Sequence, residues 1–330
     1  NKESFAKATE FLAGGGLLYV APEGQSHVAR RLRPLKSGTA RIALATEAAH
    51  NWQLGLLILP SGVTYDAPNY FRTKTVVMGG EPLRVSDYRA MYEEDSFKAA
   101  RQLTNDLQER MQSLLVHTAD EEQDQFLAQI EILYREENPI SPKADFYRSQ
   151  SIAKELQAIQ KSDEKQYIDL QNAVNQFFIK MKAHKVNSIA VLPKAEQPSL
   201  FQQILLLIIG FPIFLYGLIN NALAVFIPVA ITRKVNLYYG YNAMMKALVG
   251  LITFTIFWSL QTYLIYQLFD GWAAAIYFAS LYPTGILAWD YYKYAQQFGN
   301  NRRFQQLDKT QQQDLIDQRE QAWKAVKGLI

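Results

Sequence analysis

The residues best suited to chemistry lie between positions 22 and 41. The turn-forming stretch Pro22–His27 (PEGQSH) brings a carboxylate, a hydroxyl and an imidazole together in sequence. Basic side chains follow with no acidic residue among them: Arg30, Arg31, Arg33, Lys36 and Arg41. Lys36–Thr39 then opens a segment with helical spacing, whose free N–H groups and positive dipole end favour an anion. This pattern predicts a phosphate site, although a solvated basic turn fits the same composition.

The elements that must position this turn alternate between helix and strand over residues 1–86. Lys2–Ala13 and Gly38–His50 have the spacing and boundaries of helices. Short apolar runs predict three buried strands: Leu17–Ala21, Leu54–Leu59 and Thr75–Met78. Helices that alternate with strands are typical of an α/β sheet with parallel character, in which ligands bind at the carboxyl ends of strands. The polar turn after Leu17–Ala21 lies at such an end.

Four blocks of residues in this region resemble the glycerolipid acyltransferases. Tyr19–His27 (YVAPEGQSH) is similar to the third motif of that family. Leu32–Gly38 (LRPLKSG) resembles the segment that follows it in fungal-type glycerol-3-phosphate/dihydroxyacetone-phosphate acyltransferases. Ile58–Tyr65 (ILPSGVTY) is similar to the fourth motif, and residues 71–83 (FRTKTVVMGGEPL) resemble the segment after it. The resemblance implies that residues 1–86 are the C-terminal part of an α/β acyltransferase domain.

The resemblance also implies a reaction. In that family a His-x-x-x-x-Asp motif removes the proton of an acceptor hydroxyl, which attacks an acyl thioester and releases coenzyme A or acyl carrier protein. We expect this pair upstream of Asn1, so that the chain is a fragment without activity of its own. The residues expected to bind the phosphorylated glycerol acceptor are Pro22, Glu23, Gly24, Ser26, His27, Arg33 and Lys36. No metal and no resident cofactor is implied, since acyl-CoA or acyl-ACP is a co-substrate.

Some positions depart from the family pattern. Gln25 and Ser26 replace the Thr-Arg that many relatives carry, so phosphate binding is expected to depend on Arg33 and Lys36. We expect Glu23 to order the loop or to bind acceptor hydroxyls.

The histidines within the chain offer weaker alternatives. His117 and Glu122 have the family spacing, but they lie in a late acidic stretch where a surface histidine is the simpler interpretation. His27 beside Ser26 suggests a nucleophile and its base, yet adjacent side chains rarely face each other and no orienting carboxylate is evident. The sequence therefore favours a role for His27 in shaping the acceptor site.

Residues 87–193 have helical patterns and predict a helical subdomain. Its acidic side chains predict a solvated face: Glu121, Glu122, Asp124, Glu136 and Glu137. Residues 292–330, rich in glutamine and mixed charges, predict a cytoplasmic tail helix.

Residues 194–291 resemble a membrane region. Between positions 197 and 289 the charged residues are Arg233, Lys234, Lys246 and Asp270. Residues 247–269 and 271–289 are long enough to cross a bilayer and predict a helical hairpin. Residues 203–232 contain two prolines and predict a re-entrant or paired segment with both ends cytoplasmic. The basic loops place the acyltransferase domain and the tail on the cytoplasmic side of a multi-pass membrane protein.

Composition narrows the function further. The 330 residues include no cysteine, which excludes disulfides, thiolate metal sites and a cysteine nucleophile. The net charge of +3 is too small to indicate nucleic-acid binding. The sequence therefore predicts a membrane-bound acyltransferase of glycerolipid synthesis, with membrane lipid among its partners. The alternative is a membrane-anchored lipid-binding or scaffold protein with a degenerate acyltransferase domain.

Overall fold

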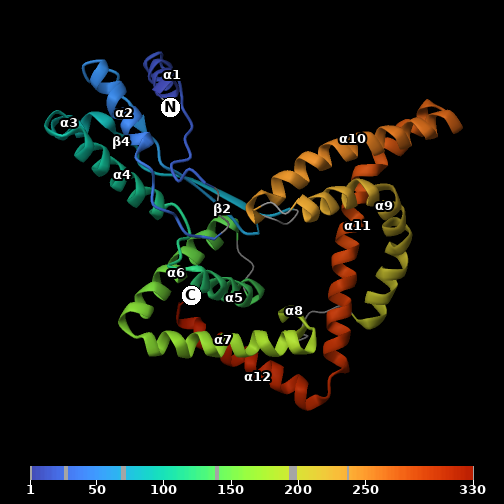
Figure 1. Cartoon of the computed structure of the whole chain (residues 1–330). Coiled ribbons are helices and arrows are strands. Elements are labelled where there is room, and N and C mark those ends of the chain that lie inside the picture. The colour runs from blue at the N-terminus through green and yellow to red at the C-terminus, as the bar shows by residue number, and fades with distance from the viewer. Residues whose placement is uncertain are drawn as a thin grey trace. The chain divides into compact units, whose positions relative to one another are not determined.

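The computed structural model describes residues 2–25, 29–67, 72–137, 141–192, 199–235 and 238–329 (Figure 1). Helices predominate in these ranges, and the chain divides into two compact units. The first comprises residues 1–131, 138–167 and 329–330, and the second comprises residues 132–137 and 168–328. The boundaries expected at residues 86, 193 and 291 stay predictions. They divide the chain by sequence pattern, whereas the two units are defined by which residues pack together.

A core of small and branched side chains joins the helices of the first unit. α1 (Lys2–Ala13) packs against α2 (Gly38–Ala49), and α2 packs against α4 (Ser96–Ser113). α4 begins after Asp95, whose carboxylate accepts hydrogen bonds from its first free N–H groups. The buried cluster comprises Ala40, Ala43, Leu44, Leu83, Val85, Ala99, Ala100, Leu103 and Leu107. The two helices expected near the N-terminus are thus confirmed to within one residue.

The strands differ from the parallel sheet that the sequence predicts. β1 (Leu57–Ile58) pairs with β4 (Leu83–Arg84), and β2 (Ser61–Tyr65) pairs with β3 (Thr75–Gly79). Both pairs are antiparallel and each forms a separate two-stranded sheet. β2 and β3 are consecutive strands joined by residues 66–74, a connection too short for the crossover of a dozen or more residues that a parallel pair needs. The prediction of parallel character is therefore wrong for the described residues.

The apolar run Leu17–Ala21 is not the buried strand that was expected. Its backbone belongs to neither sheet, and Leu17 and Tyr19 are 93% and 82% exposed. An apolar run becomes a buried strand only where a neighbouring strand pairs with its backbone and another layer covers its side chains. Among the described residues no strand pairs with this run.

Helices occupy most of residues 87–193, as the helical patterns predict. They are α3 (Arg89–Glu94), α4, α5 (Glu121–Glu137), α6 (Pro142–Ser162), α7 (Glu164–His184) and α8 (Ser188–Val191). In the first unit, the rings of Phe126 in α5 and Tyr167 in α7 meet edge to face with centroids 5.8 Å apart. Both rings are buried and form part of the packing between these helices.

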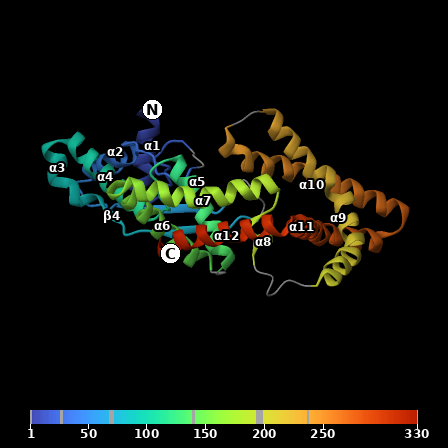
Figure 2. The same ribbon diagram turned by 90° about the horizontal axis from the view of Figure 1, so that it is seen from below.

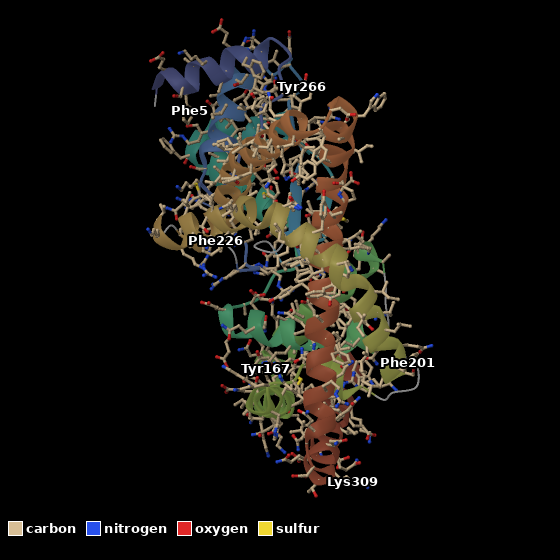
Figure 3. The ribbon with its side chains drawn as sticks, turned by 90° about the vertical axis from the view of Figure 1, so that its right-hand side faces the viewer. Phe5, Tyr167, Phe201, Phe226, Tyr266 and Lys309 are labelled. Atoms are coloured by element: carbon tan, nitrogen blue, oxygen red, sulfur yellow. The ribbon has the colours of Figure 1, made fainter. Side chains whose placement is uncertain are left out.

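The second unit contains the long apolar helices α9 (Leu200–Val235), α10 (Asn242–Leu268) and α11 (Gly271–Gln306). Of the helices described, α9 and α10 are long and apolar enough to cross a membrane, and α11, which holds the third expected segment, is not. Only 11% of the most apolar stretch of each is buried. A core helix of a soluble protein buries most of such a stretch, so these exposed apolar surfaces favour a lipid environment. Phe201 and Phe226 of α9 are both exposed and point outward (Figure 3).

α9 is one curved helix (Figure 1), and the helical pair expected over residues 203–232 is wrong in that respect. Its first half runs alongside α11, where Gly210 lies against the ring of Tyr291. Its second half runs alongside α10, where Pro228 contacts Gly250. The prolines that suggested a break lie inside the helix, and at Pro228 a neighbouring helix satisfies the backbone group that the proline frees.

A close crossing joins α9 to α11. A Cβ added at Gly217 would lie 2.2 Å from the Thr284 carbonyl oxygen, so only glycine allows this approach. One turn later, the Asn221 side-chain amide donates to the Leu281 carbonyl at 3.3 Å and its oxygen accepts from the Trp258 indole of α10 at 3.0 Å. This buried asparagine therefore links three apolar helices.

A hydroxyl of α10 donates a hydrogen bond to the α9 carbonyl that Pro228 leaves without a donor. Proline has no N–H, so the carbonyl of Ala224 four residues earlier loses its helical donor. The Thr253 hydroxyl of α10 donates to that carbonyl at 2.9 Å. The side chain of Thr253 thus replaces the missing bond and ties α10 to the second half of α9.

The C-terminal segment forms α12 (Lys309–Val326), whereas residues 292–306 of the expected tail helix continue α11, so a tail helix is present but begins later than predicted. α12 lies alongside α7 in both ribbon views (Figures 1 and 2), where Lys180 and Asp314 form an ion pair at 2.6 Å. Leu315, Ala322 and Val326 are buried. The tail is therefore packed onto the protein along its apolar face.

Candidate functional site

The turn that carries the third-motif resemblance is tied to the basic segment after it. The Gly24 N–H donates to the Ala21 carbonyl at 3.1 Å, and Gly24 has a φ of +73°, a conformation that favours glycine. One Glu23 carboxylate oxygen accepts from the Arg33 backbone N–H at 3.0 Å. The Pro22 carbonyl accepts from the Lys36 N–H at 2.9 Å. These bonds bring residues 22–25 and 33–36 together.

Several cationic or N–H groups of this loop are available to an anion. The Lys36 ammonium lies over Gly24, where an added Cβ would be 2.5 Å from its Nζ. In the described part of the chain, the buried Nε of Arg33 has no hydrogen-bond partner. α2 begins at Gly38 directly after the loop, and the side chain of its N-cap residue Ser37 makes no capping hydrogen bond. A guanidinium, an ammonium and a helix N-terminus from one short stretch can bind a phosphate or carboxylate group.

The structure therefore brings together five of the seven expected site residues: Pro22, Glu23, Gly24, Arg33 and Lys36. Ser26 and His27 lie outside the described residues. Of the two roles expected for Glu23, its bond to the Arg33 N–H fits the ordering of the loop.

A partly buried ion network anchors the start of the basic segment, and no sequence pattern predicts it. The Arg30 guanidinium contacts the Asp124 and Glu131 carboxylates of α5, each at 2.6 Å. Burial opposes its charge, but Glu131 and Asp124 outweigh burial and raise the pKa of Arg30. Thr118 donates to the Arg30 carbonyl through its N–H at 2.8 Å and its hydroxyl at 3.0 Å. Asp124 is therefore a structural partner, and the expectation of a solvated acidic face is wrong at this position.

Two further backbone N–H groups of the loop donate hydrogen bonds to side chains that lie far away in the sequence. The Leu32 N–H donates to His117 Nδ1 at 3.1 Å, and the Leu35 N–H donates to the Gln108 side-chain oxygen at 3.1 Å. His117 is half-buried, so it lies at the surface with one side of its ring bonded to the loop. The contacts that Leu35, Leu32 and Arg30 make with later segments join residues 73 to 101 positions apart. No local pattern marks such pairs, and neutral Gln108 has no sequence signal at all.

Searched over the described residues alone, the structure has no group of three or more histidine, aspartate or glutamate side chains placed to hold a metal ion. His50 ends α2, and its Nδ1 lies 2.9 Å from the Thr46 carbonyl. This confirms the helix-terminal position expected from the sequence.

Curated proteins that match part of the chain include two yeast enzymes. Glycerol-3-phosphate O-acyltransferase 1 of Saccharomyces cerevisiae is 31% identical over 121 residues, which are 36% of this chain and 16% of that enzyme. Glycerol-3-phosphate O-acyltransferase 2 of the same yeast is 34% identical over 112 residues, 32% of this chain and 15% of that enzyme. An uncharacterized acyltransferase of Schizosaccharomyces pombe is 38% identical over 82 residues, 24% of this chain and 12% of that protein.

No family model and no solved structure matches the chain. The matched stretches span less than a fifth of the length of these curated relatives. The relatives are nonetheless acyltransferases, and two of them act on glycerol-3-phosphate by name. The matches thus confirm the resemblance that the motifs indicate: this chain is related to the glycerolipid acyltransferases.

Proposed function

We propose that the chain is part of a membrane-bound acyltransferase of glycerolipid synthesis, and that its loop 22–36 binds the phosphate of glycerol-3-phosphate or a related acceptor. The observation that carries this proposal is the junction of the Glu23 turn with the Arg33–Lys36 segment. The two Saccharomyces cerevisiae relatives support a glycerol phosphate as the acceptor, since both are named for glycerol-3-phosphate.

In this function the loop binds and orients but moves no proton. Lys36 and the first N–H groups of α2 supply positive charge to the acceptor phosphate. Glu23 keeps the Arg33 segment in place, so that the acceptor hydroxyl is presented in one orientation. The acyl donor is acyl-CoA or acyl-ACP, and the acyl group passes to the acceptor hydroxyl with release of the thiol.

The decisive experiment compares Lys36→Gln with Lys7→Gln in the full-length protein. Lys7 is an exposed lysine of α1 that pairs with Glu3 in its own helix, so its variant controls for the loss of one positive charge. Transfer of radiolabelled acyl groups from acyl-CoA is measured against sn-glycerol 3-phosphate concentration. We expect Lys36→Gln to raise the KM for the acceptor about two- to fivefold, with the KM for the donor unchanged. An unchanged acceptor KM would remove the loop from the acceptor site.

The same assay distinguishes an acyltransferase from the alternative, a lipid-binding or scaffold protein. A full-length protein that binds sn-glycerol 3-phosphate but transfers no acyl group from either donor would be a lipid-binding or scaffold protein with a degenerate domain. Purified protein and both donors, acyl-CoA and acyl-ACP, are needed for this comparison.

The proposed function includes a multi-pass membrane arrangement, with the loop and the tail on the cytoplasmic side. The exposed apolar surfaces of α9 and α10 support membrane association. The basic residues Arg233, Lys234 and Lys246 support the cytoplasmic position of the connection between them. With Ser199 on the same side, the curved helix α9 is then a re-entrant segment that enters and leaves the membrane on one face. The chain has no cysteine, so a single Ser199→Cys variant reports its own position. We expect it to resist membrane-impermeant thiol reagents in intact cells, and rapid labelling would overturn this topology.

A further inference from the structure

The backbone of the anion-binding loop is held by side chains from distant helical segments. Leu32 donates its N–H to His117, and Leu35 donates its N–H to Gln108 in α4. Between these two residues, the Arg33 N–H is bonded to Glu23. Each bond fixes one peptide of the stretch that carries Arg33 and Lys36, so the bond to His117 positions Arg33 and the bond to Gln108 positions Lys36.

The bond to His117 requires one protonation state. A backbone N–H can only donate, so Nδ1 of His117 is the acceptor and carries no proton. The neutral ring therefore has its proton on Nε2. Burial, followed by the charge of Arg31, lowers the pKa of His117 and favours this neutral form. The His117 carbonyl accepts from the Gln157 side chain at 2.7 Å, which fixes the backbone beneath the ring.

Protonation of this ring would place two N–H groups against each other. The Leu32 N–H would lose its acceptor, and the adjacent Arg33 would lose part of its support. Among the described residues, the charge that acts on the ring is that of Arg31 in the loop; α6 contributes the uncharged Gln157, and the α5 carboxylates Asp124 and Glu131 are paired with Arg30. The contact thus depends on a neutral imidazole.

We infer that His117 is a positioning residue of the anion-binding loop: its neutral ring holds the backbone at Leu32 and Arg33 in the binding conformation, and its protonation releases that end of the loop while Gln108 still holds Leu35. The identity of the anion rests on the proposed function, whereas the bond to Leu32 does not. This role differs from catalysis, because His117 acts through the loop and reaches the anion only indirectly.

Hydrogen exchange of two amides tests the role without any ligand. The Leu32 amide depends on His117, and the Leu35 amide depends on Gln108, which does not titrate, so Leu35 serves as an internal reference. Exchange rates of the full chain are measured between pH 7.5 and 5, each corrected for the intrinsic pH dependence. We expect the ratio of the Leu32 rate to the Leu35 rate to rise roughly five- to tenfold on acidification, the effect of losing one backbone hydrogen bond. A constant ratio in the wild-type chain would overturn the inference.

A conservative variant sharpens this test. In His117→Asn the amide oxygen can accept from the Leu32 N–H but does not titrate, so the ratio should stay constant across the pH range. Arg31→Gln removes the positive charge near the ring and should move the midpoint of the wild-type rise to higher pH. A His117→Asn chain with the wild-type pH response would show that another group causes the change.

Binding of sulfate connects the loop to the site, since the charge of sulfate is constant over this pH range. A protonated His117 acting only through its charge would tighten sulfate binding at low pH, whereas loss of loop positioning weakens it. We expect about threefold or greater weakening from pH 7.5 to 5 in the wild-type chain and a smaller change in His117→Asn. Tighter binding on acidification in the wild type would overturn the inference. Failure of sulfate to bind at pH 7.5, with the exchange response intact, would instead overturn the proposed anion site and leave the role of His117 in the loop standing.

Discussion

Replacing Gly24 by alanine separates two properties of the acceptor turn, its backbone conformation and the position of a cation. Gly24 has a φ of +73°, and an alanine there costs about 1–2 kcal/mol of unfolding free energy. The added methyl group would also lie 2.5 Å from the Lys36 Nζ, and ordinary contact begins near 3.4 Å. The ammonium must therefore retreat by about 0.9 Å, the difference between those two distances. Because Lys36 is exposed, we expect a loss of roughly 0.5–1 kcal/mol in anion binding, or two- to fivefold in affinity.

Gly15 provides the matched control. Its φ is +80°, so alanine costs the same in conformation, but nothing lies within 4 Å of its added Cβ. Both variants should lose similar unfolding free energy in a denaturant titration. Only Gly24→Ala should weaken binding of sulfate or sn-glycerol 3-phosphate, measured by calorimetry at low ionic strength, where screening is least. Equal affinities for the two variants would refute the placement of Lys36 over the turn.

Three further comparisons test packing and protonation. Gly217→Ala should destabilise the detergent-solubilised protein by about 1–3 kcal/mol, because the new methyl group meets the α11 backbone. In the control Gly250→Ala the new methyl group has a 3.9 Å contact, and stability should change by less than about 0.5 kcal/mol. Thr253→Val removes the donor to the carbonyl that Pro228 frees and should cost about 1 kcal/mol, whereas Thr255→Val loses only a bond within its own helix and should cost little. Because the folded-state pKa of His117 is lowered, the unfolded chain binds more protons; the contribution of His117 to stability is complete above about pH 6.5 and is lost as the pH falls toward the lowered value. Denaturant titrations at pH 7.5 and 5.5 should thus show a larger decrease in the wild type than in His117→Asn, and equal decreases would contradict this assignment.

Local signals account for what could be predicted of the fold. Lys2–Ala13 ends at glycines and Gly38–His50 begins after a serine, and both form helices with nearly those bounds. The strand predicted at Leu17–Ala21 failed because an apolar run does not say which strand will pair with it. The prolines of α9 suggested a break, yet Thr253 of the neighbouring helix supplies the missing donor. Such compensation comes from another helix and leaves no mark in the local pattern.

In the candidate site, too, some residues could be predicted from local sequence and others could not. Glu23, Arg33 and Lys36 lie within one short stretch, so a motif could identify them together. Arg30, His117 and their partners could not be found in this manner, because each contact joins segments far apart along the chain. Asp124 and His117 look like ordinary surface residues in sequence. Only their tertiary contacts show that they support the loop.

The long separation between Arg30 and its carboxylate partners also sets an order of events during synthesis. Asp124 and Glu131 follow Arg30 by 94 and 101 residues. A ribosome adds about 5–20 residues per second, so about 5–20 s pass after Arg30 is made before its second partner exists. For that interval the cationic loop emerges from the ribosome without its ion pairs. The basic segment of the site is therefore translated well before the helix that completes its ion pairs, and translation through α5 sets the earliest time at which those pairs can form.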